Sequence, residues 1–64
     1  MKTYNDLKSH FTGMSIEQLE QESKRLFLSM NDLNERLLFS ASIAILGESV
    51  TEYEFDNFIK TLQL

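Results

Sequence analysis

Apolar side chains recur along this chain at steps of three and four residues, the spacing that places them on one side of an α-helix. No segment shows the strict alternation of apolar and polar residues that is typical of a half-buried strand. The pattern therefore predicts an all-α fold. The clearest sets are Tyr4, Leu7, Phe11 and Met14; Ile16, Leu19, Leu26, Phe27 and Met30; and Phe55, Phe58, Ile59 and Leu62.

Residues that cap helix ends divide the chain into four segments. Ser15 is followed three positions later by Gln18, which is a capping box, and Thr51 to Glu54 repeats the pattern. Thr3 begins the first segment, and Gly13 stands where a glycine commonly ends a helix. We predict helices at about 3–12, 15–29, 31–46 and 51–63, packed as a compact bundle in one domain that spans residues 1–64.

The third predicted helix is apolar almost all the way round, and a helix of that kind is usually buried. One interpretation makes it the central helix of the bundle, with small residues that let its neighbours approach closely. The other is that three short helices cannot cover it, so that one face binds another molecule, such as a second copy of the chain in a homodimer. Phe39, Ile43 and Leu46 are the candidate residues for such an apolar contact.

The net charge of −4 bears on which classes of partner the protein is expected to bind. A basic face is what proteins use to neutralise phosphates, so direct binding of nucleic acid is not expected. Negative charge gathers around the start of the fourth helix, where it is either a solvated helix face or a docking surface for a basic protein. The residues concerned are Glu48, Glu52, Glu54 and Asp56.

The residues that carry chemistry in enzymes are scarce here. His10 is the single histidine, cysteine is absent, and the two glycines stand too far apart for a phosphate-binding loop. We therefore expect no catalytic site, no metal site and no cofactor. The first residues lack the apolar core of a signal peptide, and no apolar run is long enough to span a membrane, so a cytoplasmic protein is expected.

Several of these positions share one register with a known family. The run Ser15-Ile16-x-x-Leu19-Glu20, then Asp32, then Phe39-Ser40-Ala41, and finally Glu48 resembles the pattern of the Hha/YmoA family over roughly residues 3–48. Members of that family are small four-helix proteins of enteric bacteria and their plasmids. The resemblance implies a four-helix fold and a regulatory role through binding the nucleoid protein H-NS, which is itself a DNA-binding protein.

The sequence departs from that family in the third helix. Where the family continues with a polar stretch, typically Ala-Asp-His-Arg, this chain has Ser42-Ile43-Ala44-Ile45. An apolar replacement of a polar face suits self-association or a different partner. We expect a non-enzymatic regulatory protein that acts by binding another protein. Two alternatives stay open: an acidic inhibitor or antitoxin of phage or plasmid origin that blocks a basic surface of its target, and a structural subunit of a homo-oligomer.

Overall fold

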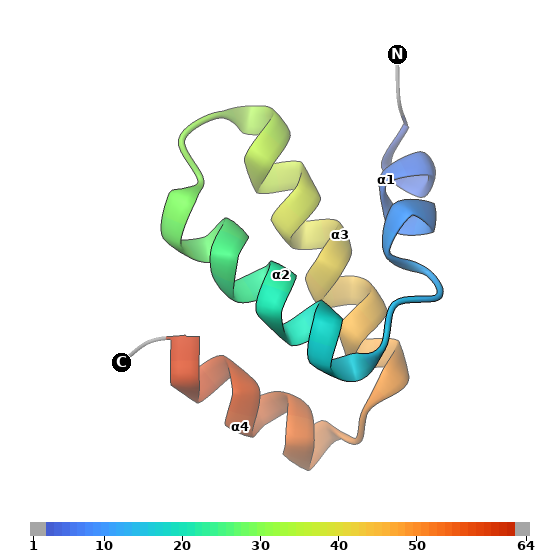
Figure 1. The fold of residues 1–64 in the computed structure, drawn as a ribbon, viewed down its shortest axis with the longest axis vertical. Helices are drawn as coiled ribbons and strands as arrows, with labels where there is room; N and C mark the ends of the chain where they lie inside the picture. The colour runs from blue at the N-terminus through green and yellow to red at the C-terminus, as the bar shows by residue number, and fades with distance from the viewer. Residues whose placement is uncertain (1–2, 63–64) are drawn as a thin grey trace.

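The computed structural model describes residues 3–62, and these residues form four α-helices (Figure 1). The predicted all-α bundle of four helices is confirmed, and residues 1, 2, 63 and 64 of the predicted domain lie outside the described part. α3 lies between α1 and α2, and α4 crosses the end of the bundle where α3 finishes (Figure 1). The bounds are α1 Tyr4–Phe11, α2 Ile16–Ser29, α3 Leu33–Ser49 and α4 Glu52–Leu62.

Side chains close the helix ends as the capping pattern predicts. Ser15 Oγ accepts a hydrogen bond of 3.1 Å from the Gln18 amide, and the Gln18 side chain accepts one from the Ser15 amide. Thr51 and Glu54 exchange the same pair of bonds at the start of α4. Gly13 follows the C-cap of α1 with a φ of +97°, a backbone conformation that side chains disfavour. These local signals therefore fix most of the helix boundaries.

The third helix starts later and ends later than the predicted range of 31–46. Asp32 is its N-cap, because the Asp32 carboxylate accepts a bond of 2.8 Å from the Glu35 amide. At the other end the helix continues through Gly47 to Ser49. Gly47 is thus a residue inside the helix rather than its end, and the ring of Phe55 lies next to it.

The core lies where the other three helices meet α3. α3 packs extensively against α2 and α1, whereas α4 makes a smaller contact with α2 and α3. The interpretation of the third helix as the central one is therefore correct for one side of it. The buried apolar residues are Leu7, Phe11, Leu19, Leu26, Ala41, Ile45, Leu46, Phe58 and Leu62.

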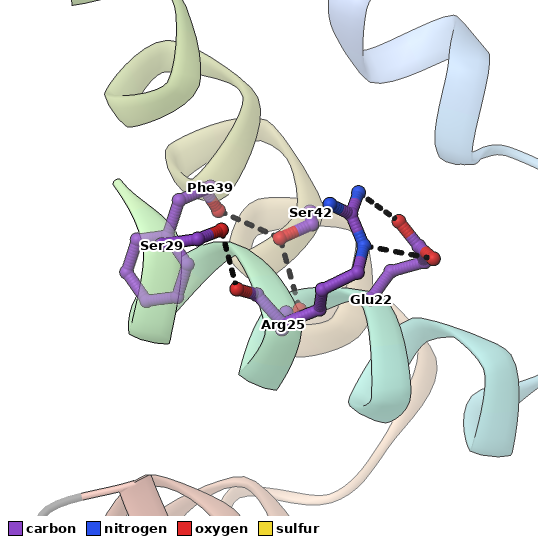
Figure 2. Close-up of polar contacts among 6 residues, drawn as sticks. Glu22, Arg25, Ser29, Phe39 and Ser42 are labelled. Carbon is purple, nitrogen blue, oxygen red and sulfur yellow. Dashed lines mark hydrogen bonds and ion pairs between the residues drawn. The ribbon is translucent and has the colours of Figure 1, made fainter. Parts of the chain in front are cut away.

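Two serines are buried among these apolar residues and explain a gap in the apolar pattern of α2. Ser23 and Ser42 are both fully buried, and Ser23 Oγ donates a hydrogen bond of 2.9 Å to Ser42 Oγ. Ser42 Oγ in turn donates to the Phe39 carbonyl at 2.7 Å, as the dashed lines in Figure 2 show. The two hydroxyls satisfy each other, so small residues can bring α2 and α3 close together without leaving a buried polar group unpaired.

Candidate functional site

The side of α3 that faces away from the core is exposed and nearly free of charge. Seven residues recur at steps of three and four along it, which places them on one face of the helix. Leu33 is 71% exposed and Leu37 is 40% exposed, and Arg36 is the one charged side chain of the set. We name this surface the outer face of α3, and it consists of Leu33, Arg36, Leu37, Ser40, Ile43, Ala44 and Gly47.

Aromatic rings border the outer face on two sides. The Tyr4 hydroxyl lies 3.2 Å from Ser40 Oγ, within hydrogen-bond distance, so the start of α1 is placed beside the middle of α3. On the other border, the rings of Phe27 and Phe39 are in contact, with centroids 5.7 Å apart. Tyr4 and Phe27 are themselves more than a third exposed. The apolar surface therefore extends beyond α3 itself.

The three residues predicted for an apolar contact fall in different places. Ile43 is half-buried and belongs to the outer face, and Phe39 is half-buried at its border. Leu46 is 1% exposed and lies in the core, where no partner can reach it without unfolding the domain. Phe39, Ile43 and Leu46 follow one another at steps of four and three residues on one stripe of α3, but the other helices leave only Phe39 and Ile43 accessible and cover Leu46.

The most exposed apolar residues of α3 were not among the predicted contact residues. The sequence groups Leu33 and Leu37 with Ala41 and Ile45 on one helical face, yet Ala41 and Ile45 are buried and the leucines are not. α1 has eight residues and begins beside Ser40, so it does not extend to the first turns of α3. Because α3 is apolar on every side, no periodicity in the sequence marks which side stays uncovered.

The four acidic candidates do not form one continuous patch. Glu54 Oε1 accepts bonds from the amide and the hydroxyl of Thr51, so this carboxylate is engaged in the cap of α4. Glu52 and Asp56 are exposed and one turn apart on α4, whereas Glu54, two residues from each, lies on another side of the helix. Glu48 is exposed in the last turn of α3.

An open groove lies between α2 and α4. Its volume is about 330 Å³, and Phe58 forms part of its lining. The side chains around it are carboxylates, an amide, a lysine and a hydroxyl. The lining consists of Glu17, Glu20, Gln21, Lys24, Phe58 and Thr61.

One ion pair lies on the surface of α2. Arg25 and Glu22 form an ion pair of 2.7 Å on the exposed side of α2 (Figure 2), and the hydrogen bond from Arg25 lowers the pKa of Glu22. Across residues 3–62 no group of histidine and acidic side chains is arranged to hold a metal ion. Within the same residues no helix is both long and apolar enough to cross a lipid bilayer.

Comparisons with known proteins add no relative to this description. No protein-family model matches the chain, and neither a curated protein nor a solved structure matches it. Membership of the Hha/YmoA family therefore stays a prediction from the sequence.

Proposed function

We propose that this chain is a non-enzymatic regulatory protein that acts by binding another protein through the outer face of α3. The observation that carries the proposal is the exposure of Leu33 and Leu37 on a face that contains a single charge. Scattered apolar residues are ordinary on protein surfaces, but a contiguous apolar patch usually marks a site of interaction. Here two leucines and three small residues follow one another along α3, and the rings of Tyr4 on α1 and Phe27 on α2 border them.

The energetics of this surface favour binding over solvation. Covering apolar surface stabilises a complex by about 25 cal/mol for each Å² removed from water, and Leu33 and Leu37 offer side chains that folding leaves uncovered. Exposed helical leucines at a spacing of four residues are also the usual anchors of helix-in-groove and helix–helix recognition. An apolar face with Arg36 at its edge requires a partner that is itself apolar at the contact.

The resemblance to the Hha/YmoA family supplies one version of this partner, a DNA-binding protein whose activity the chain would modulate. The net charge of −4 suits that version, because a DNA-binding protein carries the complementary basic charge. Direct contact of this chain with nucleic acid is not part of the proposal. The acidic inhibitor is less well supported, because Glu54 is engaged by Thr51 and faces away from Glu52 and Asp56.

Site-specific photo-crosslinking in the producing cells tests the proposal. A photoreactive amino acid replaces Leu33 in one variant and Leu28 in a control, since Leu28 is 74% exposed but lies on the side of α2 opposite its buried residues. We expect a discrete adduct from position 33 that is absent from position 28. An absence of adducts at 33, or the same adducts at both positions, would overturn the proposal. The mass of the adduct distinguishes a second copy of the chain from another protein.

A further inference from the structure

The fourth helix is attached to the rest of the domain by apolar contacts alone. Across the described part of the chain, the hydrogen bonds of α4 side chains close within the helix or with its cap residue Thr51, and no ion pair joins α4 to another helix. By contrast, the Tyr4 hydroxyl of α1 lies within hydrogen-bond distance of Ser40 on α3, and Ser23 of α2 donates to Ser42. Each of the other three helices therefore has a directional contact with a neighbour that α4 lacks.

The apolar contacts of α4 are themselves incomplete. Phe58 and Leu62 are its buried residues, yet they are 8% and 7% exposed, whereas Leu19 of α2 is 0% exposed. Phe58 lines the open groove of about 330 Å³ between α2 and α4, so one side of this interface is not closed by protein. Atoms beside such a gap lose the dispersion contacts that a closed core provides. Few buried apolar contacts are typical of a segment that opens at a low free energy.

The connection between α3 and α4 has the form of a hinge. It consists of two residues, Val50 and Thr51, and the backbone of Val50 is extended, with a φ of −129° and a ψ of 167°. Residues at the ends of helices commonly absorb the backbone rotation when two parts of a protein move. Val50 packs against the core, and Thr51 caps α4. The pivot therefore lies between these two residues, at the end of the bundle where α4 begins (Figure 1).

We infer that α4 is a hinged cover, which detaches from α2 and α3 as one unit while the other three helices stay folded. This inference does not depend on the proposed function. An isolated helix of 11 residues is marginal in water, so the detached segment loses its helical structure at the same time. α3 keeps its extensive contacts with α1 and α2 in this open state, including the bond between Ser23 and Ser42. The open state exposes Phe58 and Leu62, together with the parts of α2 and α3 on which α4 lies.

Filling the groove should slow this opening, and position 61 offers a matched pair of variants. Thr61 lines the groove, and its hydroxyl donates a hydrogen bond of 2.6 Å to the Phe58 carbonyl within α4. Thr61→Ala and Thr61→Leu both remove that bond, and both introduce a strong helix former. Leucine alone adds apolar surface beside Phe58, so the α4 amides should exchange about threefold or more slowly in Thr61→Leu than in Thr61→Ala. Equal exchange rates would show that the groove does not limit the docking of α4 and would overturn this account of its opening.

Hydrogen exchange of the purified natural chain, followed by NMR in water and at low urea concentrations, tests the hinged cover directly. The backbone amides of residues 56–62 bond within α4, and those of Leu26 and Leu46 bond within α2 and α3. We expect the α4 amides to be about tenfold or more less protected from exchange than the other two. Their free energies of opening should resemble one another and depend less on urea, since detaching one helix exposes less surface than unfolding the whole domain.

Two results of this measurement would overturn the inference. If all amides shared one free energy of opening and one dependence on urea, α4 would open only when the whole domain unfolds. If protection instead rose steadily from residue 62 back to residue 56, the helix would fray from its end and would not detach as a unit. A common, lower free energy of opening confined to α4 is the result that the hinged cover requires.

Discussion

The hydroxyl of Ser23 on α2 donates a hydrogen bond of 2.9 Å to the hydroxyl of Ser42 on α3, inside a core that is otherwise apolar. The two partners are not equivalent, because Ser42 also donates to the Phe39 carbonyl and so keeps that bond if Ser23 is removed. Replacing Ser42 instead takes away the acceptor of the Ser23 hydroxyl. The hydrogen bond therefore runs from Ser23 to Ser42, and the two serines should differ in how much their replacement lowers the free energy of unfolding.

We expect Ser42→Ala to lower the free energy of unfolding by about 1–3 kcal/mol, since it leaves a buried hydroxyl without this acceptor. Ser23→Ala should cost less, about 1 kcal/mol, and the double variant should cost less than the sum of the two. Urea unfolding followed by circular dichroism measures all three. Additive costs, or a larger cost for Ser23→Ala, would show that the bond does not couple the helices.

Replacing a glycine by alanine should change the stability of the domain in opposite directions at the two glycine positions. Gly13 has a φ of +97° with open space around its missing side chain, so Gly13→Ala should destabilise the domain by about 1–2 kcal/mol through the backbone alone. Gly47 lies inside α3, and an added methyl group would meet the Phe55 ring at 3.5 Å, an ordinary contact. Gly47→Ala should therefore stabilise the domain by up to about 1 kcal/mol. Thermal unfolding measures both, and a stabilised Gly13→Ala variant would contradict this account.

The exposed ion pair on α2 gives a pH dependence of known sign. The hydrogen bond from Arg25 lowers the pKa of Glu22, so its contribution is present above the unfolded-state pKa of the carboxyl and is lost as the pH falls through the lower folded-state pKa. We expect the titration midpoint of the Glu22 carboxyl, followed by NMR, to lie below 4.5, the ordinary value for glutamate. In Arg25→Gln the midpoint should return toward that value. Because the pair is exposed, the difference should shrink in high salt.

Local chemistry explains why the four helices could be predicted from the sequence. A side chain such as Ser15 satisfies amides within its own first turn, so its effect does not depend on the rest of the fold. Gly47 shows the limit of this reasoning. The predicted third helix ends at residue 46, just before this glycine, yet α3 continues through it to Ser49 while the ring of Phe55 on α4 lies next to it.

The candidate surface could be predicted only in part, for a geometric reason. In an amphipathic helix the spacing of the apolar residues indicates which side is buried, but α3 is apolar almost all the way round. Of the predicted contact residues, Ile43 is half-buried on the outer face and Leu46 is in the core, whereas Leu33, which was not among them, is exposed. Which side is covered depends on where α1 begins and how far α4 reaches. Those are properties of the packed bundle, and no single segment of sequence contains them.

Aspartate substitutions along α3 test this division of the helix directly. Leu46→Asp buries a carboxylate without a partner, so we expect a loss of more than about 4 kcal/mol, which unfolds a domain of this size at neutral pH. Leu33→Asp places the same charge in solvent at the first turn of the helix, where it should change the stability of the dilute protein by no more than about 0.5 kcal/mol. Ile43→Asp, at a half-buried position, should fall between them. Helical content and thermal unfolding by circular dichroism give the order. If Leu33→Asp unfolded the dilute domain as readily as Leu46→Asp, the outer face of α3 would be part of the core, and the proposed function would lose its basis.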